Sequence, residues 1–547
     1  MIELFVSLEF FKMGDRKIVK KIDDLKQIKG DAYDYYISGG EDVDLFEKIF
    51  LVDDIVDEIL KPDKYFLIGE KGSGKTAYSV YMSKSDNIDS FCTISLVENT
   101  LYQRFLNMKN QRSLELSGYK DIWINLIYLI LAENIRKKYG DTLFSNLKYK
   151  QLSKAISAFY SDAFKPEFIN AFEFIDKACA SINTMMDQGV FGTGATTAAE
   201  KSQKYEEKSY QISLMKIRDG FERAFQNLKL KNPVILFIDG IDARPREIDN
   251  TQYFECLTGL VNAVLEINQS FLKEKNIKVM LLVRPDIMYK MPIHNMNQKL
   301  RNNSVLLNWV TTYRKYIDSK LFKIADDYFM KQQDNLYKLG ECWKHYFPYK
   351  IKNNVRRRRS DNPFIEFLRY SLYKPRDILT MLNEMVDACK GDSFKHTDFE
   401  DMLVNYSVYL KGELKDYMLI YMEDSDYSNF ILFFDKFQGH KHFDYSFFET
   451  KHLEYVQYLK LLERKIPPFM ETASEALQLL YDTNIICYQT EEVIKGKKET
   501  KMFWSYKERN YANMQPEVKK VENIRFTWHT QRHFVCRVNY LKREIGK

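Results

Sequence analysis

The chain has 547 residues, of which 45% are hydrophobic and 29% are charged, and both values are typical of globular proteins. A chain of this length predicts about three to four folded domains, and its composition excludes a disordered protein. The net charge is +6, but residues 491–547 hold 14 Lys and Arg against 7 Asp and Glu. The positive charge is therefore concentrated near the C-terminus, and the rest of the chain is nearly neutral.

The cysteines and the apolar runs indicate a cytoplasmic protein without a membrane segment. Seven cysteines are scattered singly, with no C-x-x-C pair, which favours reduced thiols over disulfides or a zinc site. The longest apolar run, Ile122–Ala132, is too short to cross a bilayer and predicts a core helix instead. Acidic residues near the N-terminus stand where a signal peptide needs basic ones.

Residues 1–60 are predicted to form a helical segment that leads into the first strand. Within it, residues 43–60 carry apolar side chains at helical spacing: Leu45, Ile49, Val52, Ile55 and Ile59. We expect one amphipathic helix here, followed by Pro62 and the strand Tyr65–Ile68.

A phosphate-binding motif follows this strand directly. Residues 69–76 match the pattern G-x-x-x-x-G-K-[ST] and lie between an apolar run and a helical run: Gly69, Glu70, Lys71, Gly72, Ser73, Gly74, Lys75 and Thr76. In such a loop the glycines let backbone N–H groups surround a phosphate at a helix N-terminus. Lys75 is expected to reach the β- and γ-phosphates of a nucleotide, and the Thr76 hydroxyl to bind Mg²⁺.

The next segment predicts a strand and then a long helical region. Ser90–Ser95 is rich in β-forming residues, and residues 101–230 follow as helices. Residues 189–199 interrupt them with small residues and threonines, which indicates a loop. A second phosphate loop is the alternative there, but the segment lacks the G-K-[ST] arrangement.

An apolar strand that ends in carboxylates follows Pro233. Residues 234–239 read VILFID, which is typical of a strand buried on both faces, with Asp239 at its carboxyl end. Adjacent strand ends would bring Asp239 to Lys75, so we expect Asp239 to hold Mg²⁺ through a water molecule. Asp242 is the candidate to orient or deprotonate an attacking water, with Glu70 as the next carboxylate.

Two further strands complete a predicted α/β fold with a parallel sheet of five strands, within a core of residues 61–316. Lys278–Val283 ends in Arg284, and Ser304–Trp309 follows a short helical stretch that contains Lys299 and Arg301.

Residues 317–415 are predicted to form a helical lid. Residues 350–359 hold six basic and no acidic residues, which suits either a solvated loop or a nucleic-acid phosphate contact through Arg356–Arg359. We favour the loop. Pro375 suits the first turn of a helix and places Arg376 at its N-terminus.

Residues 416–547 show the order of a winged helix. A helix at Ala473–Asp482 precedes a strand at 484–489, a lysine-rich loop at 491–500 and a strand at 501–506. His529 and His533 have a metal-compatible spacing but lack the acidic residue and cysteines of zinc sites, so we assign the histidines to structure.

This layout resembles the additional-strand class of P-loop ATPases, to which AAA+ and STAND proteins belong. The D-G-I-D ending at residues 239–242 is most similar to STAND and related prokaryotic defence ATPases, although no Glu directly follows Asp239 or Asp242. The resemblance implies that Arg284 senses the γ-phosphate and that Arg376 is a second sensor. It also implies that Arg301 is an arginine finger for a neighbouring subunit.

The resemblance implies an ATP- and Mg²⁺-dependent molecular switch, a homo-oligomer that controls a separately encoded effector in bacterial antiphage defence. The rival interpretation is a nucleic-acid-binding loader or motor accessory that uses Arg356–Arg359 and residues 491–547. A third is a scaffold that binds a nucleotide without hydrolysing it.

Overall fold

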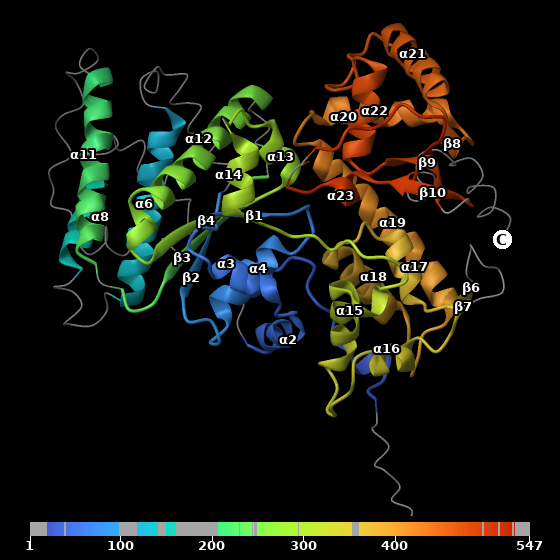
Figure 1. The fold of residues 1–547 in the computed structure, drawn as a ribbon, viewed down its shortest axis with the longest axis horizontal. Helices are drawn as coiled ribbons and strands as arrows, with labels where there is room; N and C mark the ends of the chain where they lie inside the picture. The colour runs from blue at the N-terminus through green and yellow to red at the C-terminus, as the bar shows by residue number, and fades with distance from the viewer. Residues whose placement is uncertain are drawn as a thin grey trace, which may run out of the picture. The chain divides into compact units, whose positions relative to one another are not determined.

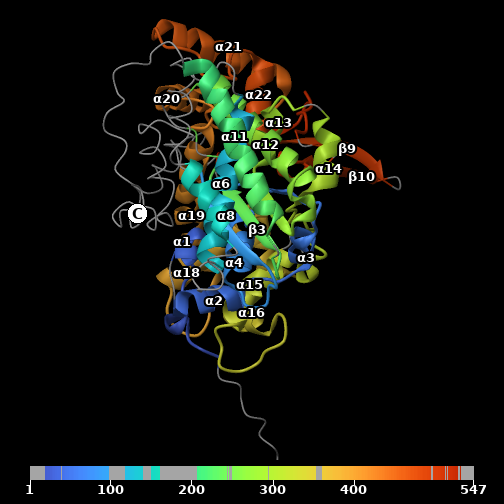
Figure 2. The ribbon, with the colours of Figure 1, turned by 90° about the vertical axis from the view of Figure 1, so that its left-hand side faces the viewer.

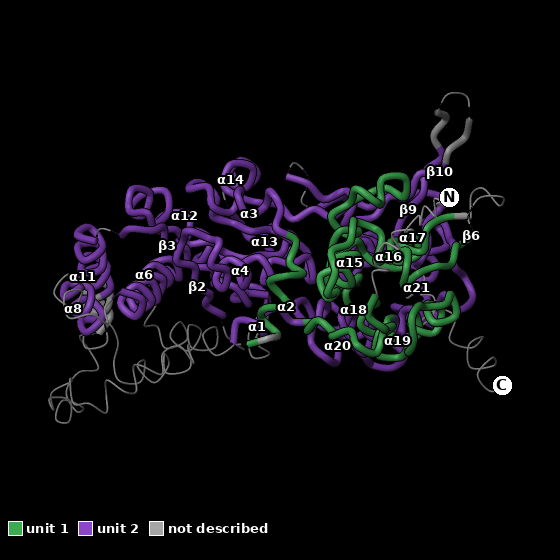
Figure 3. The backbone as a smooth tube through the Cα atoms, turned by 90° about the horizontal axis from the view of Figure 1, so that it is seen from below, with its two compact units in different colours: residues 1–30, 40–51, 311–406 green, residues 31–39, 52–310, 407–547 purple. Residues whose placement is uncertain are grey.

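The structure is a computed structural model. It describes residues 19–37, 40–97, 118–139, 149–159, 206–228, 230–242, 244, 249–293, 295–352, 360–494, 497–511, 513, 515–527 and 530. Figure 3 shows two compact units. Unit 1 comprises residues 1–30, 40–51 and 311–406, and unit 2 comprises residues 31–39, 52–310 and 407–547. The region predicted as a lid thus falls largely in unit 1, and the predicted C-terminal domain shares unit 2 with the phosphate-binding motif.

A five-stranded parallel sheet is the centre of unit 2, as predicted (Figure 1). Its strand order is β2-β3-β4-β1-β5. The strands are β1 (Phe66–Ile68), β2 (Phe91–Leu96), β3 (Val234–Asp239), β4 (Ile277–Val283) and β5 (Ser304–Leu306). The expectation that the strands before Gly69 and at Asp239 are neighbours is wrong, because β4 pairs with both β1 and β3 and lies between them.

The strands could be predicted because they are continuous apolar runs. Every residue of β3 and of β4 is buried, as expected for parallel strands that helices cover on both faces. The last strand is shorter than predicted and ends at Leu306. Beyond it, the Trp309 indole donates a hydrogen bond of 2.9 Å to the Ser73 carbonyl, so the chain there contacts the loop after β1.

Helices pack beside this sheet (Figures 1 and 2). α4 packs on β2, and α12 packs on β4 and α6, while α8 and α11 lie beyond α6. Their bounds are α1 (Tyr33–Ile37), α4 (Lys75–Lys84), α6 (Tyr119–Tyr139), α8 (Lys150–Ala158), α11 (Glu206–Gln226) and α12 (Asn250–Gln269). The predicted core helix Ile122–Ala132 is confirmed within α6, where ten of its eleven side chains are buried. Within the described ranges, no helix has the length and apolarity needed to cross a membrane.

The amphipathic helix predicted over residues 43–60 is two helices. α2 (Glu41–Ile49) belongs to unit 1 and α3 (Asp54–Leu60) to unit 2. Asp53 separates them, because its carboxylate accepts a hydrogen bond from the Ile55 N–H and so caps the start of α3. The same carboxylate accepts from the Tyr78 hydroxyl at 2.9 Å, which ties the break to α4.

Short elements precede β4, connect β4 to β5 and lead out of the sheet. They are η3 (Leu272–Glu274) before β4, then α13 (Pro285–Lys290) and α14 (Met296–Asn303) before β5, and η4 (Tyr316–Asp318) after it in unit 1.

Unit 1 is a helical unit with an aromatic core. Trp343 stacks on Phe347 with ring centroids 4.1 Å apart and meets Phe322, Phe364 and Phe367 edge-on. The elements are η1 (Ile22–Asp24), α2, α15 (Lys320–Met330), α16 (Glu341–Tyr346), β6 (Ile351–Lys352), β7 (Ser360–Asp361), α17 (Phe364–Tyr370), α18 (Pro375–Ala388) and the start of α19 (His396–Met418). Pro375 is the first residue of α18, as predicted.

The C-terminal part of unit 2 has a separate core of aromatic residues under a four-stranded antiparallel sheet of order β10-β9-β11-β8. The predicted helix Ala473–Asp482 is confirmed as α22. The predicted lysine-rich loop over residues 491–500 is mostly strand, since β9 extends to Ile494 and β10 begins at Lys497. The elements are α20 (Asp424–Leu432), η5 (Phe433–Phe437), β8 (His442–Phe443), α21 (Tyr445–Leu461), α22, β9 (Ile486–Ile494), β10 (Lys497–Phe503), α23 (Ser505–Glu508) and β11 (Ile524–Phe526).

A lysine is buried near the start of β4, the middle strand of the parallel sheet. Lys278 lies in β4 and its ammonium donates to the backbone carbonyls of Ile59 and Lys61, the latter at 2.7 Å, at the C-terminus of α3. Burial lowers the pKa of Lys278 to about 8, while the nearby Cys92 and Asp63 oppose that shift. This amine links α3 to β4 but is held in a place that disfavours its charge.

We therefore expect a characteristic pH dependence from Lys278. The folded pKa of about 8 lies below its ordinary value of 10.5, so the unfolded chain binds more protons between these values and stability rises with pH. Relative to Lys278→Met, the free energy of unfolding of the wild type should rise by up to about 3 kcal/mol between pH 7 and pH 10.5. Urea denaturation of both proteins measures this difference. Parallel pH profiles for the two would contradict the prediction.

Candidate functional site

The loop from β1 to α4 has the backbone that the motif predicts. Gly72 and Gly74 have φ values of 81° and 95°, a region that other L-residues rarely adopt, and α4 begins directly after Gly74. A Cβ on Gly69 would lie 2.2 Å from the Ser73 hydroxyl oxygen, so the loop leaves no room for a side chain there. The Ser73 hydroxyl is buried and has no hydrogen-bond partner among the described residues. These features suit a loop that closes around an anion.

Lys75 lies inside this loop. Its side chain is buried, and its ammonium donates to the Gly69 carbonyl at 3.0 Å and to the Glu70 carbonyl at 3.3 Å. Burial lowers the pKa of Lys75, and the charge of Arg284 acts in the same direction, while the carboxylates of Asp242 and Asp239 oppose it. An anion in the loop would add to the charge compensation that these carboxylates give the buried ammonium.

Thr76 and Asp239 meet at the start of α4. The Thr76 hydroxyl donates a hydrogen bond of 2.6 Å to the Asp239 carboxylate, although the two residues are 163 positions apart. The other carboxylate oxygen of Asp239 accepts from the Gly240 N–H at 2.8 Å. Burial raises the pKa of Asp239 against the effect of these hydrogen bonds and of Lys75.

The Thr76 and Asp239 oxygens are the kind of ligand that Mg²⁺ prefers. One hydroxyl and one carboxylate fit a cation that keeps water and phosphate oxygens as its other ligands, as Mg²⁺ does. Within the described part of the chain, no group of three or more His, Cys, Asp or Glu residues could hold a metal ion.

Asp242 follows β3 in a turn that α12 holds in place. Gly240 has a φ of 79°, and the Tyr253 hydroxyl of α12 donates to the Ile241 carbonyl at 2.5 Å. Asp242 is half-buried, and among nearby carboxylates its charge has the largest effect on Lys75. The turn thus holds the Asp242 carboxylate close to the loop lysine.

Arg284 follows β4 and lies between the ends of β1 and β3. Its guanidinium is 1% exposed and forms two hydrogen bonds to the Asp286 carboxylate, of 3.0 and 2.6 Å. It also lies over the Tyr417 ring at 4.0 Å, and the Tyr421 hydroxyl donates to Asp286. These contacts hold Arg284 at the end of the strand that the sequence indicated, with Asp286 as its partner.

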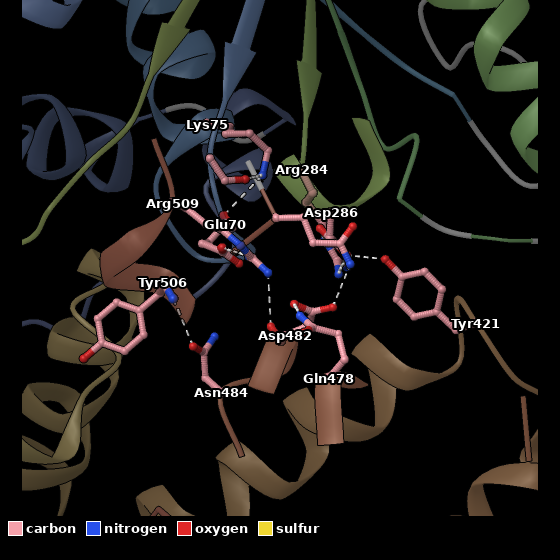
Figure 4. Close-up of polar contacts among 12 residues, drawn as sticks. Glu70, Lys75, Arg284, Asp286, Tyr421, Gln478, Asp482, Asn484, Tyr506 and Arg509 are labelled. Atoms are coloured by element: carbon pink, nitrogen blue, oxygen red, sulfur yellow. Dashed lines mark hydrogen bonds and ion pairs between the residues drawn. The ribbon is translucent and has the colours of Figure 1, made fainter. Parts of the chain in front are cut away.

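The C-terminal part of unit 2 reaches the loop itself, a contact that sequence reasoning missed (Figure 4). Arg509, directly after α23, forms an ion pair with Glu70. Lys71 lies 3.1 Å from the Asp416 carboxylate and 3.4 Å from that of Glu413, both in α19. Nothing in the residues around Arg509 marks it as part of a site. Only the tertiary fold brings it to the loop.

Arg301 lies away from the loop of its own chain. It is exposed on α14, three residues before β5, and β5 runs parallel to β1. The neighbouring Asn303 carbonyl accepts from the Tyr65 N–H at the amino end of β1, whereas the loop leaves the carboxyl end. Arg301 is therefore at the opposite edge of the sheet from Lys75. The other predicted arginine, Arg376, is half-buried in the first turn of α18 and belongs to unit 1.

Several predicted sites lie outside the described residues, namely Arg356–Arg359, residues 189–199, and His529 with His533. His452 is buried and its ring nitrogen lies 2.8 Å from the Met470 carbonyl, in agreement with a structural role. The five cysteines in the described ranges are free thiols.

A scan of the chain against models of protein families finds no match. A search of curated proteins finds no significant match either.

Proposed function

We propose that the chain binds and hydrolyses ATP with Mg²⁺ at the loop of residues 69–76. The observation that carries this proposal is the hydrogen bond between Thr76 and Asp239, because it joins the end of the loop to the carboxylate that follows β3. Loop, lysine, hydroxyl and carboxylate are the parts that nucleoside triphosphate hydrolases of the P-loop class use.

Each of these residues has a part in the proposed reaction. The loop N–H groups and Lys75 bind the phosphates, and Thr76 with Asp239 would hold Mg²⁺, which neutralises charge on the β- and γ-phosphates when bound. Asp242 orients the attacking water and accepts its proton. Glu70 is less suited to that task, because its carboxylate is paired with Arg509.

The strand order supports assignment to the additional-strand type, since β4 lies between β1 and β3 and places Arg284 near Lys75. The wider role rests on the resemblance of the D-G-I-D turn at residues 239–242 to that of STAND and related prokaryotic defence ATPases. We propose an oligomeric ATP-dependent switch in bacterial antiphage defence that controls a separately encoded effector.

The variant Asp242→Asn tests hydrolysis apart from binding. We expect it to keep the Mg·ATP affinity within a few-fold of wild type and to lose turnover by at least ~100-fold, because an amide cannot accept the proton of the attacking water. Calorimetric titration with ATP and GTP measures binding, and phosphate release measures turnover.

Asp249→Asn, which keeps a side-chain acceptor at the N-cap of α12, serves as a matched control and should hydrolyse ATP normally. Normal hydrolysis by Asp242→Asn would place the base elsewhere. A wild-type protein that binds no nucleotide would contradict the proposed function as a whole.

A further inference from the structure

Arg509 is a buried cation with no role of its own in the proposed reaction. It follows α23 directly and its side chain is 4% exposed. The segment before it is fixed, because α23 packs on α22 and the Tyr506 N–H donates to the Asn484 side chain at 3.1 Å (Figure 4). The backbone that carries the guanidinium is therefore fixed by α22 and Asn484.

The hydrogen bonds of this guanidinium are incomplete. One terminal nitrogen donates to the Glu70 carboxylate and the other to the Asp482 backbone carbonyl at 3.2 Å. The Nε–H is buried and has no hydrogen-bond partner among the described residues. An arginine usually finds partners for its buried donors, since a buried donor without one is unfavourable. Arg509 thus keeps a free donor next to the loop.

Its partner Glu70 is part of the phosphate loop. The Glu70 backbone carbonyl accepts from the Lys75 ammonium, and its side chain accepts from Arg509. Residue 70 therefore holds both cations, one through its backbone and one through its carboxylate. A nucleotide in the loop would attract the same two cations.

The charge of the nucleotide decides how strongly it would attract Arg509. Lys75 and a magnesium ion supply positive charge at the β- and γ-phosphates. A triphosphate carries more negative charge than a diphosphate, and a further guanidinium can bind its terminal oxygens in two places. ADP lacks the γ-phosphate, and its terminal β-phosphate is the group that the loop and Lys75 already bind.

We propose that Arg509 is a nucleotide-contacting residue that releases Glu70 and binds the terminal phosphate of a bound nucleoside triphosphate. This inference rests on the proposed function, and it makes the C-terminal part of unit 2 a sensor of the γ-phosphate. Glu70 then competes with the nucleotide for Arg509, so the two residues of one ion pair have opposite effects on triphosphate affinity.

Nucleotide titrations of the full chain test this proposal. With Mg²⁺, Arg509→Gln should weaken binding of a non-hydrolysable ATP analogue by about 10-fold or more and leave ADP binding within a few-fold. Glu70→Gln should tighten binding of the ATP analogue, because it removes the competing carboxylate. In the Arg509→Gln background, Glu70→Gln should have no effect, which a double-mutant cycle measures.

Two comparisons separate this role from a structural one. Arg509→Lys keeps the charge and should restore part of the preference for the triphosphate. Glu423→Gln weakens another ion pair of unit 2, that of Arg244 with Glu423 at 2.7 Å, and should leave the ratio of the two affinities unchanged.

The outcomes are distinguishable. If the wild type binds both nucleotides and Arg509→Gln keeps their ratio, or if Glu70→Gln weakens both, the ion pair is structural and the inference is wrong while the proposed function stands. A wild-type protein that binds neither nucleotide overturns the proposed function and this inference with it.

Discussion

Replacing Lys75 with alanine is expected to abolish ATP turnover and to lower Mg·ATP affinity by ~100-fold or more. The ammonium is buried inside the loop, where it donates to two backbone carbonyls, and we expect the β- and γ-phosphates to lie beside it. Burial lowers its pKa, and phosphate oxygens would reverse that effect by stabilising the charged form. Alanine provides neither the charge nor the donors.

Lys71 provides the matched control for this experiment. It belongs to the same loop, but its ammonium faces Glu413 and Asp416 of α19. Lys71→Ala keeps every backbone N–H of the loop and should leave ATP affinity within a few-fold of wild type. Calorimetric titration and phosphate release measure both variants. Undiminished binding and hydrolysis in Lys75→Ala would falsify the assignment of the site.

Loss of Arg301 is expected to lower ATP turnover by ~10³-fold, with recovery only from a neighbouring subunit. Arg301 is exposed on α14 at the edge of the sheet opposite the loop, so it cannot reach the nucleotide of its own chain. If it acts on the reaction, it acts in a second copy. Arg284 in the same chain does not replace it, because that guanidinium is bound to Asp286.

Mixing the two inactive variants tests this directly. Arg301→Ala supplies an intact loop and Lys75→Ala an intact finger, so a mixture should recover part of the ATPase activity. Lys299→Ala, on the same helix, is the control and should remain active alone. If specific activity is independent of protein concentration and mixing restores nothing, both the finger and the proposed oligomer are wrong.

The parallel sheet was largely predictable because its signals are local. A strand that helices cover on both faces is an uninterrupted apolar run, and β2, β3 and β4 lie within one residue of their predicted positions at each end. The strands β9 and β10 were only partly predicted. Charged residues are frequent where β9 ends and β10 begins, so no apolar run indicated that residues 491–500 form strands. The break at Asp53 was missed because an N-cap inside a periodic pattern looks like one more polar position.

The loop of residues 69–76 was determined by the sequence alone, since its glycines, Lys75 and Thr76 are contiguous and their spacing sets the backbone. Asp239 was predictable as the end of a buried strand, although the reason expected for its meeting with the loop was wrong, because β4 separates the two strands.

Only the tertiary structure decided which cations and carboxylates surround the loop. The Arg509–Glu70 pair joins residues 439 positions apart, and Asp286 takes the hydrogen bonds of Arg284 through the turn at the start of α13. A single charged residue carries no local pattern, so its partner depends on which strand ends and helices the fold brings together. The same holds for Arg301, whose place at the opposite edge of the sheet follows from the parallel pairing of β5 with β1.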